Sequence, residues 1–179
     1  MKNVVILHGA GETKQSFWLP YAERELVVKG YSVSIPELPD TDNPDLTKWL
    51  PRALQEKFSE KTILIGHSSG CPLILSILEN IKVKVKKAIL VAGFSTSLPD
   101  GPTKILQEEY DWEKIKNNCG EFIFINSDND PWGCDDKQGI EMWKKLGGRL
   151  ILWHGEGHMG SDTFKQPYKE FPFLVSLVG

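Results

Sequence analysis

Six short apolar runs alternate along the chain with longer segments whose apolar residues recur at helical spacing. The runs have the length of β-strands, and several are rich in Val and Ile; they are 4–7, 31–35, 62–65, 88–92, 122–125 and 150–153. The helical segments are about 16–29, 46–58, 69–80, 110–118, 137–147 and 167–178. Strands that alternate with helices predict an α/β fold, in which helices cover both faces of a parallel sheet.

The apolar runs differ in a way that predicts their places in the sheet. Tyr31-Ser32-Val33-Ser34-Ile35 alternates apolar and polar residues, whereas 62–65 and 88–92 are almost continuously apolar. Alternation leaves one face of a strand partly solvated, and a continuous apolar run is typical of a strand that is buried on both faces. The run 31–35 is therefore expected at an edge of the sheet, and 62–65 and 88–92 near its centre.

The length and the distribution of apolar residues favour one soluble domain over residues 1–179. A chain of 179 residues is long enough for one compact core and short for two. No apolar run approaches the roughly 18 residues that a membrane span needs, and the run 4–7 is too short for the core of a signal peptide. A cytoplasmic location without membrane attachment is expected.

The net charge argues against a nucleic-acid-binding protein, and the cysteine content argues against a protein held together by disulfides. The net charge is −3, whereas nucleic-acid-binding proteins carry a basic excess. Lys82, Lys84, Lys86 and Lys87 alternate with valines before an apolar run and are expected to be a solvated strand entry. The three cysteines, Cys71, Cys119 and Cys134, are odd in number and show no paired spacing, which favours reduced thiols in the cytosol.

A chemical motif follows the apolar run 62–65. Gly66-His67-Ser68-Ser69-Gly70 is a G-x-S-x-G sequence between a strand and a helical segment, which is the context that this motif needs. A sharp strand-to-helix turn brings the two elements close together at Gly66 and Gly70, where side chains would collide. The same turn lifts the Ser68 hydroxyl clear of the sheet. The motif predicts that Ser68 is a nucleophile.

A serine hydroxyl becomes a good nucleophile only when a neighbouring base takes its proton. In folds with this motif the base is a histidine in the loop after a late strand. His158 lies in a glycine-flanked loop after the run 150–153 and is the expected base, with His154 at the strand end as the reserve. His67 lies inside the turn and His8 ends the first run, so a later acid is not expected to orient either of them.

The acid that orients the base is expected in the loop after the run 122–125. Asp128 and Asp130 both lie there, and physical reasoning leaves them nearly equal. The carboxyl ends of parallel strands meet at one edge of a sheet, so this loop, the Ser68 turn and the His158 loop can converge. Asp135 and Asp136 are expected to face solvent.

An oxyanion formed by attack on a carbonyl needs two N–H donors. Ser69 follows the nucleophile at the positive end of a helix and is expected to supply one of them. The sequence His8-Gly9-Ala10-Gly11 after the first run has small residues that allow the backbone to approach a substrate oxygen. Ala10 is the expected second donor.

Other functional classes fit the same residues less well. Gly9-Ala10-Gly11 begins like a dinucleotide fingerprint, but Lys14 occupies the position of its third glycine. His154 and His158 are four residues apart, yet glycines between them argue against the helix that would align two metal ligands. No metal and no cofactor are expected. A binding protein that keeps a hydrolase fold without using its triad is the alternative from another class.

Three stretches of the sequence carry a resemblance to a known family. They are 60–70, which includes the G-x-S-x-G motif, then 112–119, and Asn129-Asp130-Pro131. With them the chain resembles the retinoblastoma-binding-protein-like small serine hydrolases of the α/β-hydrolase superfamily, over most of its length. The resemblance implies Ser68 as nucleophile, Asp130 as the acid and His158 as the base. It also implies a shortened hydrolase fold with about six parallel strands in the order 2-1-3-4-5-6. The chain has no Leu-x-Cys-x-Glu motif, so binding to a retinoblastoma-type pocket is not carried over.

These features together predict a serine hydrolase for small carboxylic esters, with amides as a second substrate class, acting through an acyl-enzyme. The segment 93–109 is too short for a large lid, which predicts an open site. Trp132 and Met159 lie next to the expected catalytic loops and are candidates for the wall of the acyl pocket. The expected partner is a small-molecule substrate, and the sequence names no protein partner.

Overall fold

The computed structural model describes residues 2–100 and 103–179. The strands of this part of the chain are β1 (Asn3–Leu7), β2 (Ser32–Ser34), β3 (Thr62–His67), β4 (Lys87–Val91), β5 (Phe122–Ser127) and β6 (Arg149–Trp153). Its helices are α1 (Leu19–Val28), α2 (Leu46–Ala53), α3 (Gly70–Asn80), α4 (Trp112–Asn117), α5 (Asp136–Leu146) and α6 (Pro172–Val178). Each predicted strand and helix has a counterpart in the structure.

The strands form one parallel sheet in the order β2-β1-β3-β4-β5-β6, which confirms the predicted order. β2 lies at an edge and is partly exposed, as its alternating sequence indicated. β3 and β4 are neighbours within the sheet and are buried along their full length. The prediction of edge and centre from the polar pattern is therefore confirmed.

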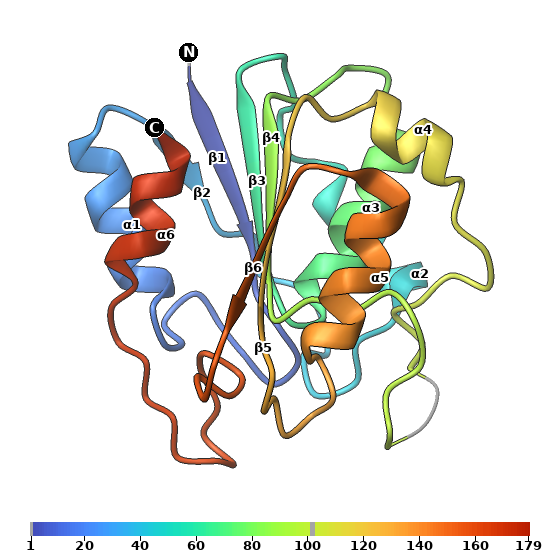
Figure 1. Ribbon diagram of the computed structural model, residues 1–179. Helices are drawn as coiled ribbons and strands as arrows, with labels where there is room; N and C mark the ends of the chain where they lie inside the picture. The colour runs from blue at the N-terminus through green and yellow to red at the C-terminus, as the bar shows by residue number, and fades with distance from the viewer. Residues whose placement is uncertain (1, 101–102) are drawn as a thin grey trace.

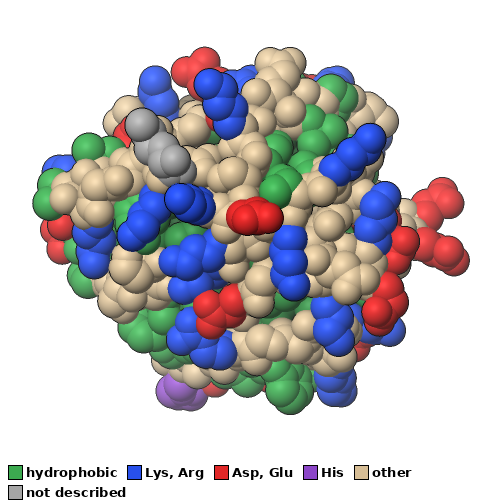
Figure 2. Space-filling view, turned by 90° about the horizontal axis from the view of Figure 1, so that it is seen from above, with side chains coloured by type: hydrophobic (Ala, Val, Ile, Leu, Met, Phe, Trp, Pro, Cys, Tyr) green, Lys and Arg blue, Asp and Glu red, His purple; other side chains and the backbone are tan. Residues whose placement is uncertain are grey.

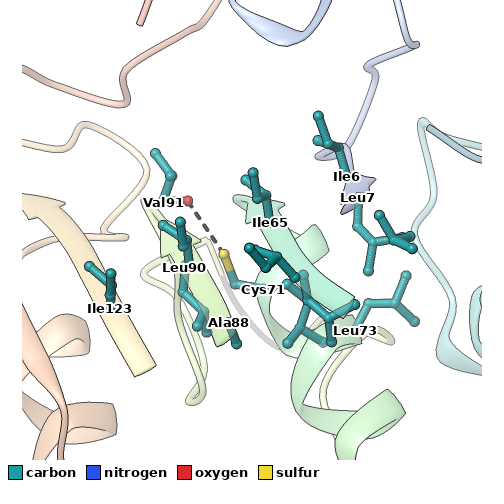
Figure 3. Close-up of a cluster of buried hydrophobic side chains, with 14 of the residues drawn as sticks. Ile6, Leu7, Ile65, Cys71, Leu73, Ala88, Leu90, Val91 and Ile123 are labelled. Carbon is teal, nitrogen blue, oxygen red and sulfur yellow. Dashed lines mark hydrogen bonds between the residues drawn. The ribbon is translucent and has the colours of Figure 1, made fainter. Parts of the chain in front are cut away.

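Helices cover both faces of the sheet. Figure 1 shows α1 and α6 side by side on one face, and α2, α3, α4 and α5 on the other. α3 follows the Ser68 turn and is buried from Gly70 to Leu78. Figure 3 shows its Cys71 and Leu73 packed against side chains of the strands, with the Cys71 Sγ donating to the Val91 carbonyl oxygen at 3.4 Å. The turn that carries Ser68 is thus anchored in the most deeply buried part of the core.

The largest departures from the predicted helix ranges are at the end of α2 and at the start of α6. The segment expected to be helical to residue 58 ends at Ala53, and the Lys57 carbonyl instead accepts a hydrogen bond from Asn3 Nδ2 at the start of β1. The last helix begins at Pro172 rather than near 167. Tyr168 has a φ of 36°, a left-handed backbone that a right-handed helix cannot contain.

Basic side chains gather on the face at the amino ends of the strands, as Figure 2 shows. Lys82, Lys84 and Lys86 are exposed there, as expected for a solvated strand entry. Lys87 differs from that expectation, because it is buried and donates from Nζ to the Leu177 carbonyl oxygen. The turn that carries Ser68 lies at the opposite, carboxyl ends of the strands.

In the described residues, helices are all too short or too polar to cross a bilayer.

Candidate active site

A cavity of about 510 Å³ opens at the carboxyl ends of the strands. Its wall holds the predicted nucleophile Ser68, the predicted base His158, and the two predicted oxyanion donors Ala10 and Ser69. These residues come from three separate loops, after β1, β3 and β6. The parallel sheet brings the loops together, as the sequence analysis expected.

Ser68 occupies the turn between β3 and α3 in a strained conformation. Its φ is 50°, in the left-handed region that residues with a Cβ atom rarely adopt. Close packing at the flanking glycines imposes this turn. A Cβ atom on Gly70 would lie 2.1 Å from the Leu7 carbonyl oxygen, and one on Gly66 would lie 2.9 Å from the Gly70 carbonyl group. Ser68 lies on the cavity wall, and the residue as a whole is 9% exposed.

The strain at Ser68 gives a first prediction. Ser68→Gly is expected to raise the free energy of unfolding by about 1 kcal/mol, because glycine adopts a left-handed backbone without the cost that a Cβ atom adds. Urea unfolding followed by circular dichroism measures the change. Ser32→Gly on the exposed edge strand is the control and is expected to destabilise. A Ser68→Gly protein less stable than the parent would contradict the strain.

Asp130 and His158 form a buried pair, and His158 lines the same cavity as Ser68. Nδ1 of His158 lies 2.7 Å from Oδ2 of Asp130, and the side chains are 6% and 0% exposed. The other Asp130 oxygen, Oδ1, accepts a hydrogen bond from the Trp132 backbone N–H at 2.8 Å. Burial lowers the pKa of His158, and the Asp130 hydrogen bond opposes this only in part. The imidazole is therefore neutral at pH 7 and able to accept a proton.

The alternative acid and the reserve base pair with each other outside the cavity. Nδ1 of His154 lies 2.6 Å from Oδ2 of Asp128, and the His154 side chain is 96% exposed. The Asp128 carboxylate raises the pKa of His154 through this hydrogen bond. Of these two acids, Asp130 hydrogen-bonds to His158 and Asp128 hydrogen-bonds to the exposed His154. The structure thus separates two acids that physical reasoning on the sequence left equal.

The loops that carry Asp130 and His158 are joined by hydrogen bonds to Asn129 and Ser127. The Asn129 Oδ1 accepts from the Gly157 N–H at 2.7 Å and from the Ser127 hydroxyl at 2.8 Å. The Ser127 Oγ in turn accepts from the Glu156 N–H at 2.9 Å. These bonds tie the loop after β5 to the loop after β6, which fixes the distance between acid and base.

Ala10 and Ser69 lie on the cavity wall beside Ser68. In the described part of the chain, neither backbone N–H donates a hydrogen bond to another residue. Ser69 is the residue before α3, so its N–H lies at the positive end of the helix dipole. Two N–H groups without partners, next to a serine hydroxyl, form the arrangement that an oxyanion requires.

The two candidates for the substrate pocket differ in position. Trp132 lies on the cavity wall, with its ring 5.1 Å from that of Phe164. Met159 is completely buried, and its carbonyl oxygen accepts a hydrogen bond from Trp18 Nε1 at 3.1 Å. Met159 is not among the described residues that line the cavity. Its backbone is left-handed, with a φ of 53°.

Sequence reasoning missed a second buried acid–histidine pair. Nδ1 of His67 lies 2.6 Å from Oε1 of Glu12, and both residues are buried. Glu12 lies on the cavity wall and its Oε2 accepts a hydrogen bond from the Gly9 N–H at 2.8 Å. Glu12 precedes the nucleophile in the chain, so a search for later acids could not find it.

Cys134 is the third residue missed, and it lies against the triad candidates. Ligand atoms of Asp130, Cys134 and His158 lie within 4.8 Å of one another, the spacing of a possible metal site. A metal ion there would have to displace the hydrogen bond between Asp130 and His158. Burial raises the pKa of the Cys134 thiol well above its usual value, so the sulfur stays protonated. Cys71, Cys119 and Cys134 are all unpaired and buried, in agreement with the expected reduced thiols.

The fold and the strained serine turn define the α/β-hydrolase class. The model of the family described as serine hydrolase matches residues 4–176. The chain therefore belongs to the serine hydrolase family, as the three sequence stretches indicated.

Relatives and solved structures agree with this assignment. The chain is 32% identical to YdeN of Bacillus subtilis (strain 168) over 135 residues, which are 72% of this chain and 71% of that protein. It is 28% identical to the serine hydrolase RBBP9 of Rattus norvegicus over 164 residues, 89% of this chain and 87% of the relative. The crystal structure of the B. subtilis ydeN gene product superimposes with a TM-score of 0.90 at 26% identity and covers 99% and 97% of the two chains.

A more distant structure shares the fold. Est1E of Butyrivibrio proteoclasticus with ferulic acid bound gives a TM-score of 0.71 at 12% identity and covers 99% of this chain and 86% of that one.

Proposed function

We propose that this serine hydrolase cleaves small carboxylic esters, with amides as a second substrate class, through Ser68, His158 and Asp130. The observation that carries the proposal is the buried hydrogen bond between Asp130 and His158 on the cavity that Ser68 lines. An acid, an imidazole and a hydroxyl in this order are the components of acyl transfer through a covalent intermediate. A cytoplasmic location remains part of the proposal, supported by three buried thiols without disulfide partners.

The first half-reaction acylates the enzyme. His158 Nδ1 donates to Asp130, which leaves Nε2 to take the proton of the Ser68 hydroxyl. The Ser68 oxygen attacks the substrate carbonyl carbon, and the N–H groups of Ala10 and Ser69 hold the negative oxygen that forms. The carbon–oxygen bond to the alcohol then breaks, and His158 returns the proton to the leaving group. Each oxyanion donor contributes about 2.7–4 kcal/mol to the stability of the transition state.

The second half-reaction releases the acid. Water gives a proton to His158 and attacks the acyl carbon, and the bond to Ser68 breaks as the serine regains its proton. The Asp130 carboxylate stabilises the imidazolium in both halves because its two oxygens are held by the Trp132 N–H and by His158 itself.

The direct test is labelling by a fluorophosphonate together with hydrolysis of a 4-nitrophenyl acetate or butyrate. The wild-type protein is expected to lose its esterase activity as it gains one phosphonyl adduct, located at Ser68 by peptide mass spectrometry. An adduct elsewhere, or hydrolysis that survives complete labelling, would contradict the proposed nucleophile.

The charges around the cavity predict a substrate preference. Its acidic lining residues are Glu12, Asp42, Asp100 and Asp162, and among the residues that the structure describes no lysine or arginine lines it. Glu12 is compensated by His67, which leaves three exposed carboxylates around the opening. We expect kcat/KM for an anionic hemisuccinate ester to be about tenfold below that of a neutral butyrate ester with the same leaving group at low salt.

The charge preference is checked by repeating the comparison at high salt. Interactions between exposed charges are largely screened beyond about 10 Å at 0.1 M salt and beyond about 3 Å at 1 M salt. The difference in kcat/KM between the two esters is therefore expected to shrink at high salt. Asp100→Asn with Asp162→Asn is expected to reduce the difference at low salt and to leave turnover of the neutral ester unchanged. An anionic ester that is hydrolysed as fast as the neutral one at low salt would contradict the expected preference.

A further inference from the structure

The His67 ring, one residue before the nucleophile, has a hydrogen-bond acceptor at each nitrogen. Nδ1 faces the Glu12 carboxylate at 2.6 Å, and Nε2 lies 2.9 Å from the His158 carbonyl oxygen. A neutral imidazole has one N–H donor, and only the imidazolium has two. A ring that donates to a carboxylate and to a carbonyl at once is therefore a cation.

The surroundings of the pair favour its charged form. Burial alone would lower the pKa of His67, but the charge and hydrogen bond of Glu12 raise it above its usual value. Burial would raise the pKa of Glu12, and the charge of His67 together with the hydrogen bonds from His67 and Gly9 lowers it instead. A completely buried imidazolium is tolerated because its partner carries the opposite charge and the remaining N–H is satisfied.

The pair connects the three loops that form the candidate active site. Glu12 Oε2 accepts from the Gly9 N–H, next to the oxyanion donor Ala10. A Cβ atom on Gly9 would lie 2.7 Å from Glu12 and 3.0 Å from the Ser68 Cβ, so this backbone is wedged between the pair and the nucleophile. On the other side, His67 holds the carbonyl oxygen of His158. One buried ion pair thus contacts the oxyanion loop, the serine turn and the base loop.

The charge of His67 also acts on His158 directly. The two rings lie 4.9 Å apart. The titratable groups that act on His158 are Asp130, His67 and Glu12, with the Cys134 thiol nearby, and His67 is in turn influenced by Glu12 and Asp130. His8 lies near His67 as well, and burial lowers its own pKa, so it adds no charge at pH 7. A cation beside His158 opposes a second positive charge there.

We propose that Glu12 and His67 form a positioning ion pair, which aligns the oxyanion loop and the base loop on the serine turn and keeps His158 unprotonated. The inference rests on the proposed function, because it concerns the same active site. Neither residue transfers a proton to the substrate. The pair acts through the geometry and the protonation state of His158.

The test is the double variant Glu12→Gln with His67→Gln. The two introduced amides keep an acceptor for the Gly9 N–H and a donor at the place of the His67 Nε2, so both outer hydrogen bonds persist without charges. Activity requires neutral His158, so kcat/KM rises as pH passes its pKa. Loss of the His67 cation raises the pKa of His158, and loss of the Glu12 carboxylate lowers it. The His67 charge has the larger effect, so the net change is a rise in the pKa. The acid limb is expected to move to higher pH by about 0.5–1 unit.

The same variant is expected to lower kcat about tenfold with KM little changed, because a displaced base affects the reacting geometry rather than substrate binding. The matched control is Asp128→Asn with His154→Gln, which removes the exposed pair and is expected to leave both kcat and the acid limb unchanged. Glu12→Gln alone serves if the double variant does not fold, since His67 without a carboxylate loses its proton and the limb moves the same way.

An acid limb that stays in place, with only the melting temperature lowered, would overturn the proposal and leave the pair a purely structural contact. Nitrogen-15 NMR of the histidine rings gives a readout that needs no activity. His67 is expected to carry protons on both ring nitrogens at pH 7. A His67 ring with a proton on only one nitrogen would also overturn the proposal. A wild-type protein that hydrolyses no ester refutes the proposed function, and the ring spectra still decide the protonation of the pair.

Discussion

Ser68→Ala is expected to reduce kcat for 4-nitrophenyl butyrate by about 10⁴- to 10⁶-fold. Without the hydroxyl no acyl-enzyme forms, and the oxyanion donors alone act on a carbonyl that only water attacks. A factor of 10⁴ corresponds to about 5.5 kcal/mol of transition-state stabilisation. The measurement is steady-state hydrolysis at pH 8, combined with fluorophosphonate labelling, which is expected to disappear in the variant.

The alanine variant is expected to fold as the parent does, because alanine and serine meet the same strain at a φ of 50°. Near-ultraviolet circular dichroism checks this. Ser32→Ala, on the exposed edge strand, is expected to retain full activity and labelling. Equal rates for Ser68→Ala and wild type would end the assignment of the nucleophile.

Asp130→Asn is expected to lower kcat by about 10⁴-fold at pH 7. The asparagine amide can present an N–H to His158 Nδ1 and thereby stabilise the tautomer whose proton is on Nε2, where the serine proton has to go. The variant also leaves the imidazolium of the transition state without a carboxylate. Since the Asp130 side chain is completely buried, solvent cannot replace it.

Asp128→Asn is the matched comparison, since it makes the same change two residues earlier. It removes the partner of an exposed histidine and is expected to change kcat less than twofold. Its effect appears instead in His154, whose pKa is expected to fall toward its usual value, as proton NMR can follow. A larger loss in Asp128→Asn than in Asp130→Asn would exchange the roles of the two acids.

The fold was predictable because its signals are local. Continuous apolar runs correctly predicted strands within the sheet, and the alternation of apolar and polar residues at 31–35 correctly predicted an edge strand. The turn at Ser68 was predictable because its two glycines and its serine lie within five consecutive residues between a strand and a helical segment. Gly66 meets Gly70 directly, and the Leu7 carbonyl that excludes a side chain from Gly70 ends the neighbouring strand.

The side-chain pairing in the site was not predictable from local signals. Asp128 and Asp130 are two residues apart in the sequence. Which of them pairs with a buried histidine depends on which histidine the loop after β6 places in the interior. Glu12 lies 55 residues before His67, and no periodicity relates them. The complete burial of Met159 and its left-handed backbone, at a residue other than glycine, are features that the sequence does not reveal.

Part of the cavity wall comes from residues other than the candidate reacting groups and their hydrogen-bond partners. Leu98, Asp100 and Thr103 line the cavity from the connection between β4 and α4, and Asp162 and Thr163 from the loop beyond His158. None of these side chains bonds to Asp130 or His158. Substitutions at these positions can therefore change substrate specificity without breaking the hydrogen bonds of Asp130 and His158. A library restricted to these positions is a natural starting point for directed evolution, and for the divergence of new specificities in nature.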